Sequence, residues 1–355
     1  VHHSTYQRAL EGISRSLAKE LGARGTTVNL VKLPTNVELP NYKTVEEFFT
    51  SCRSAFITGQ ALIANEAVKS GRELSEKICV VTGGAGLIGS ATVQRLAAEG
   101  ATVVIVDIPQ MESRADALVG NNISFIGGDL TNESDRKNLL EEIRSKHGRI
   151  DVLINNAGIL RDRMLMNMTE QEWDDVIKVH LKGTFAPTHH AVQLWRAKNK
   201  ETGEPVNGRV INTSSVSGLF GNTGQTNYGA AKAGIAAFTI IAARELARMG
   251  VTVNAISPSA VTRMTEDLRE RTEQERAAGD PKWIAPVATY LASAEASDIT
   301  GRIFHAGGGN FSVMEGWHHG PNCAPYADPV ELGPVLRKMA KEARRNADMM
   351  GNDLD

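Results

Sequence analysis

The stretch Ile78-Cys-Val-Val-Thr-Gly-Gly-Ala-Gly-Leu-Ile-Gly89 decides the fold. It joins a short β-branched run directly to a glycine-rich turn, and a helical pattern follows. Gly83, Gly86 and Gly89 allow a tight turn, a close approach of the backbone to a pyrophosphate, and close packing of the next helix. The free N–H groups and the positive dipole end of that helix favour an anion. The stretch therefore predicts a strand, a dinucleotide-binding turn and a helix.

Strand-like and helical patterns alternate from Lys77 to Gly309. Strands are expected at 78–81, 102–106, 123–126, 151–154, 209–212, 251–256 and 301–304. Helices are expected near 87–99, 132–147, 170–198 and 228–248. Because the strands are almost continuously apolar and alternate with helices, they predict a parallel sheet covered on both faces. The expected fold class is α/β, a doubly wound, Rossmann-type sheet of about seven strands that binds ligands at the carboxyl ends of its strands.

Polar residues follow the second, third and fourth predicted strands. Asp107 ends the second strand, where a carboxylate can accept hydrogen bonds from both ribose hydroxyls and would repel a 2′-phosphate. This position predicts NAD as the cofactor, although an aspartate at a strand end can also simply cap a turn. Asp129 ends the third strand, and the run Asn155-Asn156-Ala157-Gly158 follows the fourth. Both lie on the edge of the sheet where the adenosine half of the cofactor is expected.

Ser215, Tyr228 and Lys232 are the candidate catalytic residues. Ser215 stands just past the fifth strand, Tyr228 begins the next helix, and Lys232 lies one turn later on the same face. A tyrosine titrates near ~10, so it needs help to act as an acid or base at neutral pH. A neighbouring ammonium lowers that pKa, and the tyrosine can then exchange a proton with a carbonyl or an alcohol. Ser215 would hydrogen-bond the same substrate oxygen, and Lys232 could hold the nicotinamide ribose.

Together these motifs resemble the classical short-chain dehydrogenases/reductases. The resemblance covers residues 77–311 and rests on Thr82–Gly89, Asn155–Gly158, Ser215, Tyr228-Gly-Ala-Ala-Lys232 and Asn254-Ala-Ile-Ser-Pro258. Within the family, segments 179–185, 258–265 and 283–286 resemble the (3R)-hydroxyacyl-CoA dehydrogenase units of multifunctional β-oxidation enzymes. The resemblance implies that Pro258 and Thr262 line the nicotinamide pocket and that Ile88, Leu130 and Asn156 touch the cofactor. The predicted cofactor contacts are Gly83, Gly86, Leu87, Ile88, Gly89, Asp107, Asp129, Leu130, Asn156, Ala157, Gly158, Tyr228, Lys232, Pro258 and Thr262.

Two positions depart from the family pattern. Leu87 occupies the slot of the middle glycine, and Gly86 comes one place early, which is the spacing of the extended branch of the family. The phosphate contacts are therefore expected to differ in detail. His180 stands where the four-residue catalytic set usually has an asparagine, and hydroxyacyl-CoA enzymes that resemble this chain carry the same histidine. It is predicted to be catalytic, by holding a water for proton relay or by titrating itself.

The N-terminal residues repeat part of the later pattern. When Asn29 is aligned with Asn254, the run 27–29 matches 252–254, and further on 57–59 matches 299–301. Residues 1–70 therefore predict a degenerate, non-catalytic partial copy of the same fold, followed by a linker at 71–76. The catalytic domain is expected at 77–311 and a tail with one helix at 312–355. A degenerate copy before an intact one also resembles the high-molecular-weight 3-oxoacyl-ACP reductases of actinobacteria.

Composition excludes several other classes of protein. A formal net charge of −2 in 355 residues gives no basic patch for nucleic acid or a membrane surface. Three distant cysteines indicate neither a disulfide framework nor a metal site, and the histidine pairs lack acidic partners at ligand spacing. No apolar run approaches the ~18 residues of a membrane span. A cytoplasmic protein without a metal is expected, and the resemblance implies a homo-oligomer.

The leading hypothesis is an NAD-dependent oxidoreductase that interconverts a 3-hydroxyacyl and a 3-oxoacyl thioester of CoA or ACP. Arg263, Arg269 and Arg271 could meet CoA phosphates, although solvated helix charges are the favoured explanation. One alternative keeps the chemistry and changes the substrate to a hydroxysteroid or another secondary alcohol. An alternative of a different class is a non-catalytic scaffold that kept the fold, which intact Ser215 and Tyr228 argue against.

Overall fold

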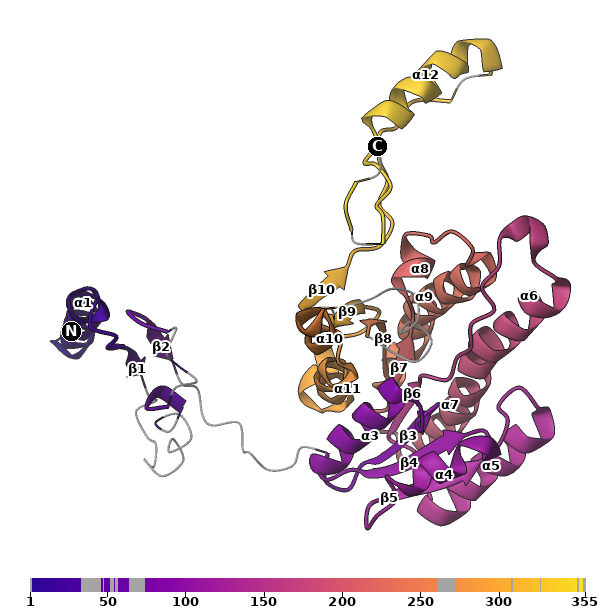
Figure 1. Ribbon diagram of the computed structural model, residues 1–355, viewed down its shortest axis with the longest axis horizontal. Coiled ribbons are helices and arrows are strands. Elements are labelled where there is room, and N and C mark those ends of the chain that lie inside the picture. The colour runs from indigo at the N-terminus through magenta and orange to yellow at the C-terminus, as the bar shows by residue number, and fades with distance from the viewer. Residues whose placement is uncertain are drawn as a thin grey trace. The chain divides into compact units, whose positions relative to one another are not determined.

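A computed structural model of the chain describes most of its residues in two compact units, Val1–Gly71 and Arg72–Asp355 (Figure 1). The described residues are 2–32, 46, 48–51, 54, 57–63, 74–260, 272–307, 309–325, 327–349 and 351–353. The boundary between the units falls between Gly71 and Arg72, and the linker at 71–76 stays a prediction.

The second unit is built on one sheet in the order β10-β9-β8-β7-β6-β3-β4-β5. Its strands are β3 (Ile78–Thr82), β4 (Thr102–Asp107), β5 (Ile123–Gly127), β6 (Val152–Asn155), β7 (Arg209–Thr213), β8 (Thr252–Ser259), β9 (Ile303–Gly307) and β10 (Asn310–Met314). All neighbours are parallel except β10, which is antiparallel to β9. The predicted parallel, doubly wound α/β fold is confirmed.

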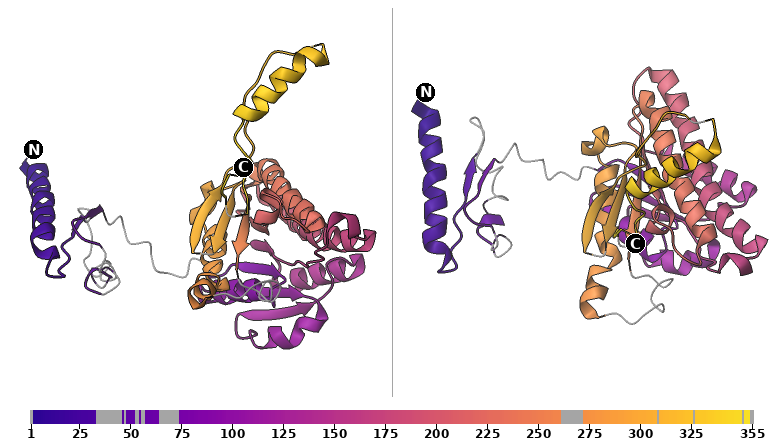
Figure 2. Two further views of the ribbon diagram at one scale, coloured as in Figure 1. Left: turned by 45° about the horizontal axis from the view of Figure 1, so that its top comes forward. Right: turned by 90° about the horizontal axis from the view of Figure 1, so that it is seen from above.

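Helices cover both faces of this sheet (Figure 2). The helices of the second unit are α3 (Leu87–Ala98), α4 (Glu112–Asp116), α5 (Glu133–His147), α6 (Glu170–Ile177), α7 (Gly183–Thr202), α8 (Val216–Leu219), α9 (Thr226–Leu246), α10 (Glu273–Ala278), α11 (Ala285–Ala292) and, projecting away from the sheet, α12 (Pro329–Glu342) (Figure 1). The sequence predicts one helix over 170–198, but a π-helical turn, η5 (Lys178–Lys182), separates α6 from α7. In such a turn each backbone hydrogen bond spans one residue more than in an α-helix, and turns of this kind are common at functional sites.

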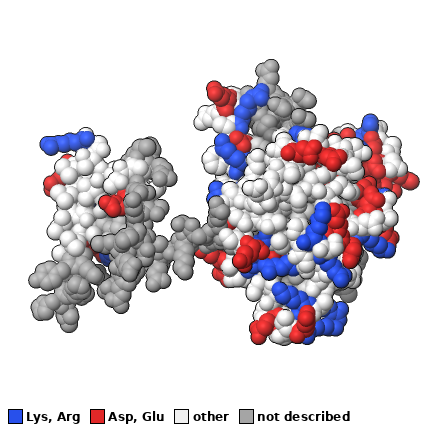
Figure 3. Space-filling view, turned by 90° about the horizontal axis from the view of Figure 1, so that it is seen from below, with Lys and Arg blue, Asp and Glu red and all other residues white. Residues whose placement is uncertain are grey.

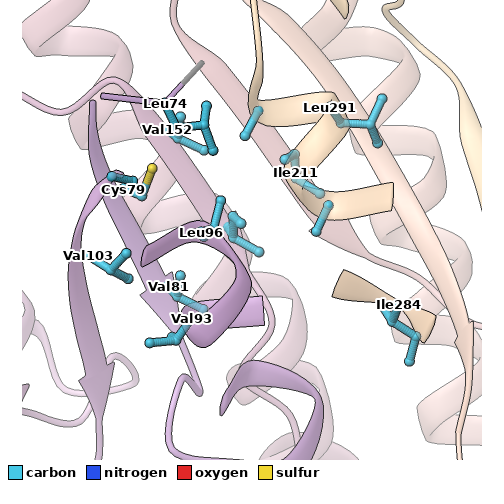
Figure 4. Close-up of a cluster of buried hydrophobic side chains, with 14 of the residues drawn as sticks. Leu74, Cys79, Val81, Val93, Leu96, Val103, Val152, Ile211, Ile284 and Leu291 are labelled. Carbon is cyan, nitrogen blue, oxygen red and sulfur yellow. The ribbon is translucent and has the colours of Figure 1, made fainter. Parts of the chain in front are cut away.

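A hydrophobic core lies on each face of the sheet. On one face Leu96 of α3 and Leu291 of α11 pack with Val81 and Ile211 from the strands (Figure 4). On the other face Trp195 of α7 belongs to a second buried cluster, with side chains of α5 and α9. Burying an aliphatic side chain of this size contributes about 1.5–3 kcal/mol. Because both faces are buried, the strands are apolar at nearly every position, which is why their sequence pattern is continuous rather than alternating.

The sheet extends further than the sequence predicts. β10 crosses residue 311, where the catalytic domain was expected to end, and its side chains are mostly exposed. β10 follows Gly307 and Gly309 and alternates polar and apolar residues, so its sequence differs from the continuously apolar pattern of the buried strands. The one helix expected in the tail is α12, which ends at Glu342 because Ala343 leaves the helical conformation.

The described residues of the first unit include the helix α1 (His2–Gly22) and the strands β1 (Leu30–Lys32) and β2 (Ala61–Ile63). The strands are parallel, and Leu30 lies opposite Ala61. In the second unit α9, β8 and β9 follow one another in the same way. Ala255 there lies opposite Ile303, and these two residues are the counterparts of Leu30 and Ala61 in the aligned sequences. The two segments therefore share one strand register.

Side-chain contacts repeat as well. Asn29 and Asn254 each donate from Nδ2 over 2.7 Å to a carbonyl oxygen two residues before a glycine. Those glycines, Gly59 and Gly301, both have a φ of +70°. A Cβ on Gly59 would lie 3.4 Å from the Cβ of Ala18 in α1, and a Cβ on Gly301 would lie 3.4 Å from the Cβ of Ala243 in α9. The two segments therefore share these contacts as well as their strand register.

Charged side chains are interspersed over the face of the second unit shown in Figure 3, where lysines and arginines alternate with acidic residues. Among the described residues no helix is both long and apolar enough to cross a membrane. The same part of the chain contains no group of three His, Cys, Asp or Glu side chains placed to hold a metal ion.

Candidate active site

Steric constraints explain the glycines of the nucleotide turn. Gly83 has a φ of +63°, and a Cβ there would lie 2.8 Å from the Cα of Ala157. A Cβ on Gly89 would lie 2.2 Å from the carbonyl oxygen of Gly83. Gly86 precedes α3 without any side-chain cap, so the first N–H groups of that helix remain available to an anion. Leu87 is the first helical residue and is 36% exposed, so a side chain fits there.

Asp107 lies at the carboxyl end of β4 and contacts this turn. One carboxylate oxygen accepts a hydrogen bond from the Ala85 N–H (3.1 Å), and the other accepts from the Ile108 N–H (2.9 Å). Burial raises the pKa of Asp107, whereas these two backbone hydrogen bonds and the charge of Arg114 lower it. Asp107 therefore fixes the turn in addition to its predicted part in cofactor choice.

The loops after β3 and β6 are joined directly. Thr82 Oγ1 accepts hydrogen bonds from the N–H groups of Asn156 (3.0 Å) and Ala157 (3.2 Å), and Asn156 Nδ2 donates to the Gly83 carbonyl (3.1 Å). A cleft at this edge of the sheet is lined by residues that include Ile88, Asn156 and Pro258. Three of the predicted contacts, from α3, the loop after β6, and β8, therefore meet at one place.

Asp129 and Leu130 lie at the edge beside β5. Asp129 Oδ1 accepts from the Thr131 N–H (2.8 Å), so this aspartate caps its own turn. The carbonyl of Leu130, which is buried, accepts from Arg136 Nη1 (2.9 Å). Thr262 and the three arginines considered for CoA phosphates lie outside the described residues.

The three candidate catalytic residues come together where β7 ends. Ser215 is the N-cap of α8, and Tyr228 and Lys232 lie on successive turns of α9. Lys232 is 3% exposed, its Nζ donates to the Thr213 carbonyl (2.7 Å), and the same atom is 5.5 Å from the centre of the Tyr228 ring. The arrangement places a phenol, a hydroxyl and an amine around one point beside the nucleotide turn.

Burial dominates the electrostatics of this group. It raises the pKa of Tyr228; the hydrogen bond to Ser215 opposes that rise, and the charge of Asp162 adds to it. Burial also lowers the pKa of Lys232 to about 7. The lowering of the tyrosine pKa by Lys232, which the sequence predicts, stays a prediction: the influences on Tyr228 in the structure are burial, the Ser215 hydrogen bond and the charge of Asp162.

His180 is carried into this group by η5 and is 1% exposed. Its ring meets that of Tyr228 edge to face, with centroids 5.2 Å apart. Nε2 lies 3.1 Å from the amide nitrogen and 2.8 Å from the carbonyl oxygen of Ile159. Burial, followed by the charge of Lys232, lowers the pKa of His180 to about 3 although the Ile159 bond opposes this. The histidine is therefore neutral at physiological pH, and the expectation that it titrates is corrected.

Two further residues support the site: Asn227, which was not found from the sequence, and Gly158, whose packing against His180 the sequence did not predict. Asn227 is fully buried; its Nδ2 donates to the carbonyls of Arg161 and Glu172 (3.0 Å each), and its Oδ1 accepts from the Tyr228 N–H (2.7 Å). Gly158 was predicted only as a cofactor contact, yet a Cβ there would lie 2.5 Å from Cε1 of His180. A polar residue directly before the tyrosine, in the first turn of a helix, was the available signal for Asn227.

The fold and this site define an oxidoreductase that uses a dinucleotide. The family model for short chain dehydrogenases matches residues 77–275, and the chain belongs to that family. It is therefore an oxidoreductase that acts on CH–OH groups, and its family uses NAD(P). The resemblance inferred from the motifs is confirmed.

Two relatives and one solved structure match this chain over nearly their whole length. A hydroxyacyl-CoA dehydrogenase, ChsB1 of Mycobacterium tuberculosis, is 38% identical over 282 residues, which cover 75% of this chain and 89% of the relative. The 3-oxoacyl-[acyl-carrier-protein] reductase FabG of Thermotoga maritima is 40% identical over 249 residues, covering 66% of this chain and 98% of the relative. A crystal structure of a short chain dehydrogenase from Mycobacterium avium matches with a TM-score of 0.69 and 42% sequence identity. The match covers 77% of this chain and 97% of that one.

Proposed function

We propose that the second unit interconverts a 3-hydroxyacyl and a 3-oxoacyl thioester, of CoA or of an acyl carrier protein, with NAD as cofactor. The observation that carries the proposal is the buried group of Ser215, Tyr228 and Lys232 beside an uncapped nucleotide turn. The thioester is supported by relatives at 38–40% identity whose names specify hydroxyacyl-CoA and 3-oxoacyl-[acyl-carrier-protein].

The residues of the cleft fit the dinucleotide. Gly83 and Gly89 keep the turn tight, because a Cβ on either would overlap neighbouring backbone atoms, and the uncapped start of α3 is suited to the pyrophosphate. We assign Asp107 to the adenosine ribose, where its charge disfavours a 2′-phosphate and so favours NAD. Ile88, Asn156 and Pro258 would form the walls. When bound, the nicotinamide supplies or accepts the hydride.

The chain's own residues handle the proton. Tyr228 gives its phenolic proton to the substrate oxygen during reduction and takes it back during oxidation. Ser215 holds the same oxygen by a hydrogen bond. Lys232, fixed by the Thr213 carbonyl, would hold ribose hydroxyls and restore the phenol proton. His180, which stays neutral, can relay a proton only as a hydrogen-bonding group.

We propose that the first unit is a non-catalytic partial copy of the same fold. It keeps the counterparts of α9, β8 and β9, whereas its aligned positions for Tyr228 and Lys232 are His3 and Gln7. Neither can form the phenol and amine pair. Residues 71–76 would then be a linker and 312–355 a tail. We also propose that the protein acts on a small acyl thioester and binds neither nucleic acid nor a membrane. A homo-oligomeric state and a cytoplasmic location are proposed as well.

The test compares kcat/KM for three ketones with NADH: acetoacetyl-CoA, a 3-oxosteroid and an acyclic ketone without a thioester. We expect the thioester to be preferred by at least about tenfold, because binding of the CoA portion contributes to the transition state. A higher kcat/KM for the steroid would replace the proposed substrate with the hydroxysteroid alternative.

A further inference from the structure

The C-terminal arm, defined as the described residues from Glu315 to Asp353, is held at both of its ends by the region around α8. At its start, Met314 of β10 packs on the same small apolar cluster as Leu219 of α8. The two limbs of the arm approach one another where Arg344 pairs with Glu315 at 3.9 Å. The chain that leaves the sheet at β10 therefore comes back toward it.

A compact turn forms the end of this arm. Asp348 and Asn352 are joined by the backbone bond Asp348 N–H to Asn352 C=O (2.8 Å), and the Asp348 carboxylate accepts from the N–H and the Nδ2 of Asn352. Ala347 and Asp353 form an antiparallel bridge around it. These bonds give the turn a shape of its own, so its side chains are presented in fixed directions.

Met349, in this turn, contacts α8. The hydroxyl of Ser217 donates to Met349 Sδ over 3.6 Å, and Ser217 is only 6% exposed while Met349 is 36% exposed. The two residues are 132 positions apart in the sequence. A thioether is a weak acceptor but a large, adaptable apolar group, so the contact combines a weak hydrogen bond from Ser217 with packing.

Ser217 in turn touches both sides of the catalytic group. Its N–H donates to the Oγ of Ser215 over 3.2 Å. Its carbonyl oxygen lies 3.1 Å from where a Cβ on Gly229 would stand, so it packs directly against the residue after Tyr228. A displacement of Ser217 would therefore change its hydrogen bond to the hydroxyl of Ser215.

We propose that Met349 is a positioning residue for Ser215 and that the C-terminal arm is a working part of the active site. By filling the space over Ser217, Met349 keeps its N–H directed at the Ser215 oxygen. That bond occupies one lone pair of the oxygen, so the hydroxyl proton of Ser215 is left to face Tyr228 and the substrate. The inference rests on the proposed catalytic role of Ser215 and not on the identity of the substrate.

The test uses the full chain with Met349→Ala, Met349→Leu and Ser217→Ala, and with Val330→Ala as a control on the same arm, at a side chain that is 80% exposed. We expect Met349→Ala and Ser217→Ala to lower kcat about tenfold, with the Kd for NADH unchanged and no further loss in the double variant. Met349→Leu, which keeps the packing, should restore most of the rate. The control should match the parent.

The pH profile separates positioning from general stability. Because the Ser215 hydrogen bond lowers the pKa of Tyr228, loosening Ser215 should move the pH midpoint of alcohol oxidation upward in Met349→Ala. Parent-like kcat and midpoint in both alanine variants would overturn the proposal.

Hydrogen exchange supplies a readout that needs no turnover. The amides of 215–219 should exchange faster in Met349→Ala than in Val330→Ala, and equal rates would also contradict the inference. If the chain oxidises another secondary alcohol but no thioester, the proposed function fails. The same variants measured with that alcohol still decide the role of Met349.

Discussion

Lys232 and Tyr228 are buried side by side. Burial raises the pKa of Tyr228 and lowers that of Lys232, so that it favours the uncharged form of each. The result is a tyrosine that keeps its proton and a lysine that releases one near neutral pH. Such a pair suits reduction, where a proton must be delivered to the substrate oxygen. It also has a consequence for stability, because the lysine titrates at different pH values when folded and unfolded.

We predict that the free energy of unfolding rises with pH between about 7 and about 10.4 through Lys232. In this window the unfolded lysine binds a proton that the folded one does not, so the slope is positive and at most about 1.4 kcal/mol per pH unit. Below pH 7 both states are protonated and the full cost of burying the charge is present. Denaturant unfolding of the cofactor-free parent and Lys232→Met checks this. Identical slopes in the two proteins would show that the lysine is not desolvated.

Asp107→Ala should lower the kcat/KM ratio of NADH to NADPH by at least about tenfold, because the charge that repels the 2′-phosphate is lost. Part of the fall in NADH kcat/KM will come from the turn, which loses the bond to Ala85. Asp116→Asn, an exposed carboxylate on α4, is the matched control and should leave the ratio unchanged. A parent that prefers NADPH would refute the assignment of Asp107.

At the scale of elements, η5 and the loop after β6 are fitted to one another through Gly158 and His180. We predict that Gly158→Ala destabilises the protein by about 1–3 kcal/mol and lowers kcat, because the new methyl group overlaps the imidazole. Changing His180 to Ala in the same chain should recover the stability but not the rate. The control is Gly120→Ala, where a Cβ meets nothing within 4 Å. Melting temperatures and kcat of the three variants provide the measurement.

The sequence predicted the sheet well because continuous apolar strands and a glycine turn are local signals. It placed Ser215, Tyr228 and Asp107 where the structure has them for the same reason. It did not show the π-helical turn, since nothing in the run from 170 to 198 marks an extra residue. Nor did it give the pKa of His180, because that value depends on burial by residues distant in the sequence. The sequence did not indicate Met349 either, because its contact with Ser217 joins residues 132 positions apart.

At the scale of the whole molecule, the described site residues and both hydrophobic cores of the catalytic fold belong to the second unit. We therefore predict that a chain beginning at Arg72 keeps a kcat within about twofold of the full chain, since its reacting groups are complete. Steady-state turnover with equal concentrations of folded protein measures this. Loss of activity in the shortened, folded chain would mean that the first unit takes part in catalysis.

The most direct test of the account is turnover of acetoacetyl-CoA by NADH in the parent and in Tyr228→Phe. Removing one hydroxyl takes away the proton donor while leaving the pocket and Lys232 in place. We predict that kcat falls by about 10²- to 10⁴-fold and that the Kd for NADH changes only a few fold. A phenylalanine variant that turns over acetoacetyl-CoA at a tenth of the parent rate or more would contradict the assignment of Tyr228 as the proton donor.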